Sequence, residues 1–309
     1  MKLLLIGAGP MALEYCKVLT ELNVDFDVIG RGGNSAKNFT KQSGIECQTG
    51  GFSSEHDYNQ YDYAIIAVTE NMLGEVCRQA ISSGIKNILV EKPGGLTIED
   101  IRHVAEVATK KSVGVFVAYN RRFYASTIEA QKRIELDGGL KSFEFEFTEW
   151  GHVIEPLVKE EGVKENWFLA NSSHVVDLAF YLGGVPTDFS SYTSGELSWH
   201  RKASVFAGAG ISSLGALFTY KANWSAPGRW GVELLTNKHR YIMRPLEKLF
   251  VQDIGSIEVR EVPIEDDDDM KFKPGLLKQV KSFLENPEQL LTIHDQEQAL
   301  SFYSKMLGE

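Results

Sequence analysis

The sequence predicts an α/β protein with an N-terminal, doubly wound parallel sheet and a C-terminal α+β domain whose open sheet is mostly antiparallel. Two observations carry the prediction. Short apolar strands alternate with helical stretches through the first 120 or so residues, which is typical of a parallel sheet. Beyond them, apolar and polar residues alternate one by one, as in strands with one wet face. We therefore expect domains at 1–122 and 123–309.

The elements of the first domain follow from this alternation. A helix after the first strand places Ala12, Cys16 and Leu19 at spacings of three and four residues, which gives it one apolar face. Thr97 is a candidate N-cap, with Asp100 three residues further on. The expected strands are 3–6, 26–29, 63–68, 87–90 and 113–118, and the later helices are 36–43, 71–83 and 98–111.

The second domain is expected to begin with a helix over 126–137. Phe143, Phe145 and Phe147 then alternate with Glu144 and Glu146 in a predicted strand over 141–150, and Glu149 lies nearby. Further strands are expected at 189–193, 203–207, 210–220, 231–236 and 241–243, and helices at 173–182, 274–285 and 295–307. The C-terminal helix is a candidate for packing back on the first domain. The acidic run 265–269 is predicted to be a solvated loop rather than a metal site.

Composition excludes several classes of function. The chain has 309 residues, 24% of them charged, and a net charge of −10, which disfavours nonspecific binding to nucleic acid or anionic membranes. No apolar run reaches the length of a membrane span, and the first residues form a strand rather than an export signal. Cys16, Cys47 and Cys77 lack metal-binding or disulfide spacing, so we expect reduced thiols in a cytoplasmic protein.

The most informative motif is the turn after the first strand, Gly7-Ala8-Gly9-Pro10-Met11-Ala12. A strand that delivers a G-x-G-x-x-A turn onto a helix N-terminus brings bare backbone amides close to a pyrophosphate, because glycine has no Cβ. Gly7, Gly9, Pro10 and Met11 are therefore candidate cofactor residues. The alternative is a tight turn in an ordinary strand-helix unit.

The end of the second strand favours NADP over NAD. An acidic residue at this position would bind the free ribose 2′-hydroxyl of NAD. The chain instead offers Arg31 and Ser35, a guanidinium and a hydroxyl suited to a 2′-phosphate. The alternative is a surface arginine beside a flexible glycine turn.

Two further strand ends carry polar groups. Thr69 and Asn71 follow the third long strand, and Glu91-Lys92-Pro93 ends the fourth. The order of these motifs, continued by the stretch 118–123 (Ala-Tyr-Asn-Arg-Arg-Phe), resembles the Gfo/Idh/MocA family of oxidoreductases. The resemblance covers the first 125 residues well and the second domain more weakly.

The resemblance implies an N-terminal Rossmann domain, with a sugar or cyclitol bound between the two domains. It also implies that the second sheet forms a homo-oligomer interface. Thr69, Asn71 and Glu91 would line the cofactor. Lys92 would lie near the nicotinamide and the substrate hydroxyl, where it could accept or donate the proton that accompanies hydride transfer. The alternative for Lys92 is a surface lysine.

The resemblance places a second catalytic group on the helix around His174. The family pattern has an aspartate four residues before the histidine, and this chain has Ala170 there. His174 and Asp177 match the pattern and lie on one helical face, where His174 could act as acid or base, or could pair structurally.

Other residues are candidates for substrate binding. Aromatic faces stack on sugars and amides bind hydroxyls, so Trp150, His152, Trp167 and Asn171 are candidates. By family analogy, Asn120 and Arg122 face the crevice, and an arginine there favours an anionic substrate. No clustered metal ligands occur, and hydride transfer of this kind needs no metal.

The sequence thus predicts an NAD(P)-dependent oxidoreductase that acts on a secondary alcohol or ketone of a sugar, sugar derivative or cyclitol. Two alternatives stay open. One is a dinucleotide-binding sensor or regulatory protein that has lost its chemistry, which Ala170 favours. The other is a different reduction on the same scaffold, such as that of an imine or a tetrapyrrole.

Overall fold

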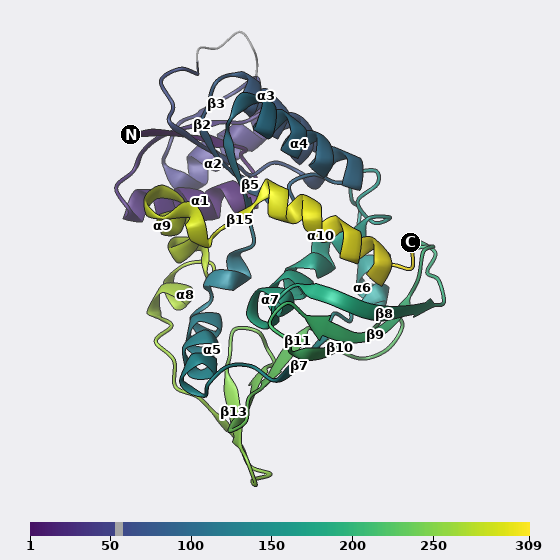
Figure 1. Ribbon diagram of the computed structural model, residues 1–309. Helices are drawn as coiled ribbons and strands as arrows, with labels where there is room; N and C mark the ends of the chain where they lie inside the picture. The colour runs from purple at the N-terminus through teal and green to yellow at the C-terminus, as the bar shows by residue number, and fades with distance from the viewer. Residues whose placement is uncertain (53–57) are drawn as a thin grey trace. The chain divides into compact units, whose positions relative to one another are not determined.

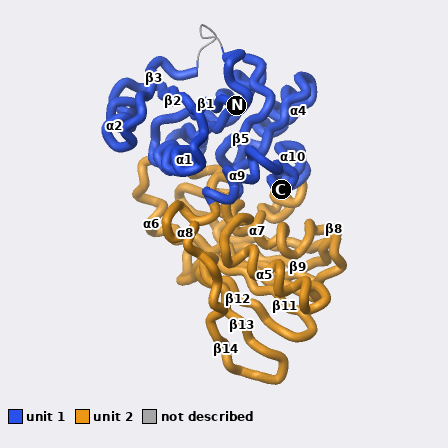
Figure 2. The backbone as a smooth tube through the Cα atoms, turned by 90° about the vertical axis from the view of Figure 1, so that its left-hand side faces the viewer, with its two compact units in different colours: residues 1–119, 160–163, 276–300 blue, residues 120–159, 164–275, 301–309 orange. Residues whose placement is uncertain are grey.

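The computed structural model describes residues 1–52 and 58–309, which form two compact units (Figure 2). Unit 1 comprises residues 1–119, 160–163 and 276–300, and unit 2 comprises residues 120–159, 164–275 and 301–309. The change near residue 120 lies close to the boundary expected at 122. Residues 276–300 belong to unit 1, although the sequence analysis grouped them with the second domain.

Unit 1 is built on a sheet in the order β15-β6-β5-β4-β1-β2-β3. Figure 1 labels β2, β3, β5 and β15 of this sheet. Its strands are β1 (Lys2–Ile6), β2 (Asp25–Ile29), β3 (Cys47–Gln48), β4 (Tyr63–Ile66), β5 (Asn87–Glu91), β6 (Gly114–Ala118) and β15 (Leu291–Thr292). The first six are parallel to their neighbours, and β15 pairs antiparallel with β6. The parallel sheet is as predicted, and the short strands β3 and β15 were not expected.

The helices of unit 1 pack by their apolar faces. Helix α1 buries Tyr15, Cys16 and Leu19 and contacts α2 and α9, while α3 contacts α4. The Thr97 hydroxyl accepts a hydrogen bond from the amide of Asp100 at 3.1 Å, so the predicted cap is confirmed. The helices are α1 (Pro10–Glu21), α2 (Gly33–Ser43), the 3₁₀ turn η1 (Glu70–Met72), α3 (Leu73–Ser82), α4 (Ile98–Lys111), α9 (Leu276–Glu285), the 3₁₀ turn η4 (Pro287–Gln289) and the first part of α10 (Ile293–Met306).

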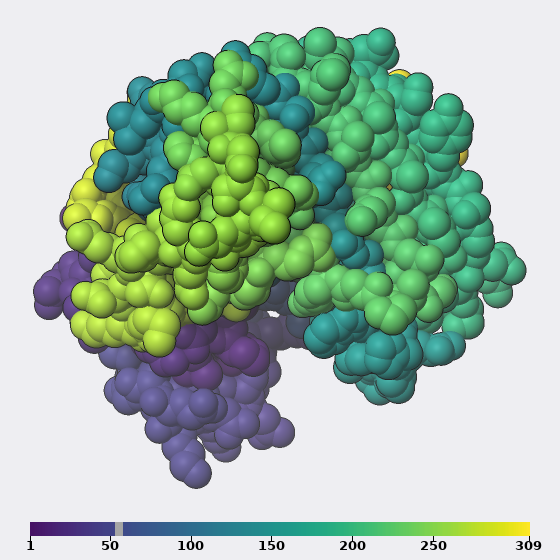
Figure 3. Space-filling model, turned by 90° about the horizontal axis from the view of Figure 1, so that it is seen from below, coloured from purple at the N-terminus to yellow at the C-terminus, as the bar shows by residue number. Residues whose placement is uncertain are grey.

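Unit 2 holds a second sheet, in the order β14-β13-β12-β11-β7-β10-β9-β8. All neighbours are antiparallel except β7 and β10, which confirms the predicted mostly antiparallel sheet. The strands are β7 (Ser142–Glu146), β8 (Pro186–Ser194), β9 (Val205–Ser212), β10 (Leu217–Asn223), β11 (Gly231–Leu235), β12 (His239–Met243), β13 (Phe250–Asp253) and β14 (Val259–Glu261). Figure 3 shows the yellow-green segments around β13 and α8 at the surface of one face.

The core of unit 2 lies between this sheet and α7. Phe180 of α7 packs edge-on against Phe145 and Phe218, with ring centroids 5.3 Å apart in both pairs. Gly183 ends the helix so close to Phe143 that a Cβ there would lie 2.3 Å from the ring. The helices of unit 2 are the 3₁₀ turn η2 (Asn120–Phe123), α5 (Ala125–Leu136), α6 (Gly151–Ile154), the π-helical turn η3 (Phe168–Ser172), α7 (Ser173–Gly183) and α8 (Asp267–Lys271).

Two expectations for unit 2 are wrong. The predicted strand 210–220 is two strands, β9 and β10, joined by a turn in which Gly215 has a φ of +74°. The acidic run is not a loop, because α8 begins within it, and Asp269 accepts hydrogen bonds from the amides of Ala125 and Gly275 at 2.7 and 2.8 Å. The strand β7 is shorter than predicted and ends at Glu146, and the Glu149 side chain beyond it is buried.

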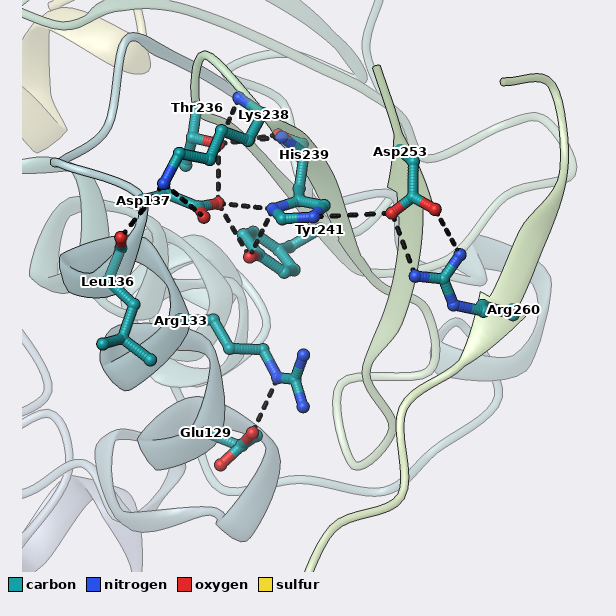
Figure 4. A network of polar contacts seen from close by, with 10 residues as sticks. All are labelled: Glu129, Arg133, Leu136, Asp137, Thr236, Lys238, His239, Tyr241, Asp253 and Arg260. Atoms are coloured by element: carbon teal, nitrogen blue, oxygen red, sulfur yellow. Dashed lines mark hydrogen bonds and ion pairs between the residues drawn. The ribbon is translucent and has the colours of Figure 1, made fainter. Parts of the chain in front are cut away.

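A polar network joins the end of α5 to β12 and β13 (Figure 4). The buried Asp137 carboxylate lies 2.7 Å from His239 Nδ1 and accepts hydrogen bonds from the hydroxyls of Tyr241 and Thr236, both at 2.8 Å. On its other side, His239 Nε2 lies 3.4 Å from Asp253. Burial would raise the pKa of Asp137, but its hydrogen-bond partners outweigh burial and hold the pKa below its usual value.

The three cysteines are buried and free, as predicted. Complete burial raises the pKa of Cys77 to about 12, so this thiol stays protonated at neutral pH. Among residues 1–52 and 58–309, no helix combines the length and the apolar character that crossing a membrane requires.

Candidate functional site

The glycine-rich turn of unit 1 connects β1 to α1 and needs glycine at its first position. Gly7 has a φ of +132°, and a Cβ there would lie 2.2 Å from the carbonyl oxygen of Ala67. Gly9 is the N-cap of α1, and no atom lies within 4 Å of the position that a Cβ would occupy. The helix starts with Pro10 and has no acidic residue in its first turn. This open helix N-terminus fits an anionic group such as a pyrophosphate.

The predicted cofactor residues lie at one edge of the sheet. Strands β1, β2, β4 and β5 are parallel and in register, so their carboxyl ends are neighbours. The turn at Gly7, the segment after Ile29, the segment after Ile66 and Glu91 therefore line the same edge. The sequence-predicted residues Arg31, Thr69 and Lys92 follow these ends within three residues.

The end of β2 offers a cation and no carboxylate. Gly30 is required, because a Cβ there would lie 2.8 Å from Ala8 Cβ. Arg31 is exposed, and α2 begins just after it with no acidic residue in its first turn. The hydroxyl of Ser35 donates to the carbonyl of Gly32 at 2.9 Å, so its oxygen can still accept. The segment after β2 thus presents a guanidinium and a hydroxyl.

Thr69 and Asn71 are held together in the turn that follows β4. The Thr69 hydroxyl donates to Asn71 Oδ1 at 2.8 Å, and Thr69 is exposed. This pair, predicted to line the cofactor, leaves the Asn71 amide N–H groups for other partners.

Two residues that were not predicted from the sequence form hydrogen bonds to the Glu-Lys-Pro turn. Tyr15 of α1 donates its hydroxyl to Glu91 Oε1 at 2.7 Å. Burial, and then the charge of Glu91, raise the pKa of Tyr15, so the phenol stays a donor. Gln296 of α10 is fully buried and donates to the carbonyl of Pro93 at 3.2 Å. The amphipathic patterns of α1 and α10 indicate which face of each helix is buried. They do not indicate which groups Tyr15 and Gln296 contact.

In unit 2, two predicted substrate residues bind each other. Arg122 forms a two-pronged contact with Asp177, with Nε at 2.8 Å and Nη2 at 2.6 Å from the carboxylate oxygens. Burial alone would lower the pKa of Arg122, but Asp177 outweighs it and raises the pKa. The Arg122 guanidinium also lies 4.6 Å from the Tyr181 ring centroid. Its charge is therefore compensated within the protein.

His174 is buried in the first turn of α7, and its ring centroid lies 6.1 Å from that of Trp230. Ala170, where the family pattern has aspartate, is buried in η3. A carboxylate nevertheless comes near this segment from another element. Glu149 accepts hydrogen bonds from Asn171 at 2.9 Å and Ser172 at 2.7 Å.

Glu149 is a third residue that was not singled out for chemistry from the sequence. Burial raises its pKa, and the hydrogen bonds from Ser172 and Asn171 and the charge of Arg229 only partly oppose this. The predicted substrate residue Asn171 thus holds this carboxylate in the structure. The signal in the sequence was slight, since Glu149 is one of several glutamates near the alternating phenylalanines.

The other predicted substrate residues have different surroundings. Trp150 is 47% exposed and donates its Nε1–H to the carbonyl of Gly228 at 2.8 Å, and His152 is also exposed. Trp167 is buried and packs edge-on against Trp199, with ring centroids 6.1 Å apart. The Asn120 side chain donates to the carbonyl of Pro274 at 2.9 Å. Trp150 is thus open to solvent, and Trp167 is a core residue.

The described residues contain no group of three or more histidines, cysteines or carboxylates placed to hold a metal ion. The strand order, the glycine turn and the open helix end together define unit 1 as a dinucleotide-binding domain. Residues 1–119 match the model of an oxidoreductase family with an NAD-binding Rossmann fold. This family is Gfo/Idh/MocA, so the match confirms the resemblance that the motifs of these residues predicted.

Individual relatives are distant. An uncharacterized oxidoreductase of Schizosaccharomyces pombe is 26% identical over 129 residues, which are 40% of this chain and 35% of that protein. A Desulfitobacterium hafniense protein, described as a proposed NADPH-dependent oxidoreductase, is similar over 100% of this chain and 95% of its own, with a TM-score of 0.81 and 15% identity. Levoglucosan dehydrogenase, in complex with NADH and L-sorbose, is similar over 100% of this chain and 96% of its own, with a TM-score of 0.79 and 17% identity. At these identities the solved structures establish the fold of the whole chain.

Proposed function

We propose that the chain is an NAD(P)-dependent dehydrogenase or reductase that acts on a secondary alcohol or ketone of a sugar, sugar derivative or cyclitol. The observation that carries the proposal is the shared carboxyl edge of β1 and β5, with the glycine turn after β1 and Glu-Lys-Pro at the end of β5. The likeness to levoglucosan dehydrogenase, bound to NADH and L-sorbose, supports a carbohydrate substrate.

The chain's own residues fit a dinucleotide. The α1 N-terminus and the open space at Gly9 would hold its pyrophosphate. Thr69, Asn71 and Glu91 would lie along it, and Arg31 with Ser35 would bind a 2′-phosphate, so we propose NADP as the preferred form. When bound, the nicotinamide supplies or accepts the hydride.

Lys92 and His174 are the proposed proton-handling residues. As a carbinol carbon loses hydride, its hydroxyl must lose a proton, and the reverse reaction needs a donor. Lys92 Nζ would hold the substrate hydroxyl and take or return this proton. His174 can serve as a second acid or base, since a neutral imidazole has both a donor and an acceptor nitrogen.

Cofactor binding is tested first, by fluorescence titration with NADPH and NADH. We expect saturable binding with NADPH tighter. Arg31→Ala should weaken NADPH binding about ten- to hundredfold, which corresponds to hydrogen bonds to a charged group, and leave NADH binding nearly unchanged. Equal losses for the two coenzymes would exclude the proposed role of Arg31.

Catalysis is tested with a panel of sugars, cyclitols and their derivatives, followed at the nicotinamide absorbance. With an active substrate, Lys92→Met should lower kcat about 10²- to 10⁴-fold and spare coenzyme binding, because it removes a proton acceptor and not a phosphate contact. Lys86→Met, an exposed lysine just before the other end of β5, is the matched control. Equal rates for Lys92→Met and wild type would rule out the role of Lys92.

Ala170 favours one alternative, a coenzyme-binding sensor or regulatory protein without turnover. Tight NADPH binding without turnover of any panel substrate would support it. We also propose a cytoplasmic homo-oligomer that assembles through the sheet of unit 2. Light scattering coupled to size-exclusion chromatography tests the assembly, and a monomeric mass would exclude it.

A further inference from the structure

Unit 2 contains a cluster of two arginines around one indole ring, next to the candidate acid–base residue His174. The guanidinium carbons of Arg121 and Arg229 lie 4.9 and 4.8 Å from the ring centroid of Trp230. Arg121 belongs to η2, and Trp230 immediately precedes β11. Trp230 also lies beside His174, with ring centroids 6.1 Å apart, so the two arginines and the imidazole share this indole as a neighbour.

The charge of Arg121 is not matched by an ion pair. Within the described residues, 1–52 and 58–309, no carboxylate lies within 4 Å of its guanidinium, and its buried Nε has no hydrogen-bond partner. Glu247 and Glu149 act on it only through longer-range attraction, while Arg229 repels it. A buried guanidinium that lacks a paired anion is costly, so the position favours an added negative group.

The neighbouring residue Arg122 is the contrast. It follows Arg121 directly in the chain, yet its Nε and Nη2 contact the Asp177 carboxylate at 2.8 and 2.6 Å. From the sequence, Arg122 was expected to favour an anionic substrate. In the structure its charge is already compensated by Asp177, whereas the charge of Arg121 is not matched by an ion pair with any described residue.

Arg229 provides the accessible side of the cluster. Its side chain is 49% exposed, and its nearest carboxylate oxygen, of the buried Glu149, is 3.7 Å away. The guanidinium also lies 4.9 Å from the ring centroid of Trp150, which is half exposed. The groups that face the cluster are therefore two cations, the partly opposing Glu149, the exposed Glu247 and the imidazole of His174.

We infer that Arg121 and Arg229, held at Trp230 beside His174, bind the anionic group of a carbohydrate substrate, either a carboxylate or a phosphate ester. A guanidinium can donate two parallel hydrogen bonds to a pair of oxygens of either group, and the exposed Trp150 face suits a sugar ring. The inference rests on the proposed function and specifies its substrate class. The enzyme then prefers charged sugar derivatives to their neutral parents.

The test uses matched substrates that differ only in charge, such as glucose, glucuronate and glucose 6-phosphate, with parallel sets for other sugars and cyclitols. We expect kcat/KM to be about ten- to hundredfold higher for the charged member, as for hydrogen bonds to a charged group. The carboxylate and phosphate arms identify which anion is bound. If neutral sugars are turned over with the same kcat/KM as their charged partners, the inference is wrong.

Variants assign the preference to the cluster. Arg229→Gln and Arg121→Gln should abolish it mainly by raising KM for the charged substrate, and Arg229→Lys should restore part of it. Arg240→Gln is the control, because Arg240 lies in β12 and is paired with Glu144 and Glu233. A preference that survives both glutamine variants would refute the assignment. If Arg121→Gln fails to fold, Arg229→Gln still tests the assignment, because Arg229 is exposed.

Calorimetric titration with glucuronate and glucose 6-phosphate separates this inference from the proposed function. Binding that Arg229→Gln weakens tenfold or more supports the anion site even if no substrate is turned over. Absence of turnover with intact NADPH binding counts against the proposed enzyme. Absence of binding by either charged sugar, to the protein with or without NADPH, counts against the anion site.

Discussion

The Asp137 network offers a stability prediction whose size follows from the contacts in Figure 4. Asp137→Ala removes an acceptor that is 6% exposed and serves His239, Tyr241 and Thr236 at 2.7 to 2.8 Å. Hydrogen bonds to charged groups contribute about 1.5–3 kcal/mol each. The Tyr241 hydroxyl already lies 3.1 Å from His239 Nδ1, so one bond can re-form, and His239 and Thr236 are half-buried. We therefore expect a loss of about 2–4 kcal/mol in the free energy of unfolding.

The same network fixes the sign of a pH effect. The pKa of Asp137 is lowered in the folded protein, and its ordinary value is 3.8. A carboxylate with a lowered pKa contributes stability above the ordinary value and loses it as the pH falls through the folded value. The part of the stability difference between wild type and Asp137→Ala that comes from this carboxylate should thus shrink as the pH falls below 3.8.

Urea unfolding followed by circular dichroism measures both effects. Asp253→Ala is the comparison, because Asp253 lies at the outer end of the network, is 39% exposed and pairs with the exposed Arg260. It should change stability much less than Asp137→Ala. A loss below about 1 kcal/mol for Asp137→Ala, or a loss equal to that of Asp253→Ala, would refute the reasoning.

Three further predictions concern unit 1. Gly7→Ala should weaken NADPH binding and lower the melting temperature, because its Cβ would lie 2.2 Å from the Ala67 carbonyl oxygen. Unchanged values in titration and thermal unfolding would contradict this close approach. Tyr15→Phe should cost about 1.5–3 kcal/mol in urea unfolding by removing the hydrogen bond to Glu91, and a neutral result would show that this bond contributes nothing. Thr97→Ala should cost about 1 kcal/mol and Thr97→Ser much less, and equal losses would rule out capping.

The sequence predicted the part of the fold that local patterns specify. The strand–turn–helix at Gly7 and the cap at Thr97 depend on residues within a few positions of each other, so both could be seen in the sequence. The strand expected over 210–220 was wrong because Leu214 and Leu217 continue an apolar pattern through a turn that only Gly215 marks. Pattern analysis cannot distinguish an apolar residue in a turn from one in a strand.

The residues of the candidate site that belong to short motifs could be predicted from the sequence. The contacts between residues far apart in the chain could not. The Glu-Lys-Pro motif was recognisable, but the hydrogen bond from Gln296 to Pro93 joins residues about two hundred positions apart. Likewise, the engagement of Arg122 by Asp177 and the burial of Glu149 depend on tertiary contacts. Neither charge pairing nor burial over such separations leaves a periodic signal.

The return of residues 276–300 to unit 1 has a consequence for how the protein is made. A ribosome releases the chain from its N-terminus, so the sheet that starts with β1 waits for β15 and α9 until every strand of unit 2 has emerged. An isolated fragment ending at Tyr119 would expose the edge of β6 and the surface of α1 that these late segments cover. The sheet of the nucleotide-binding unit is thus completed only after the strands of the other unit have been made.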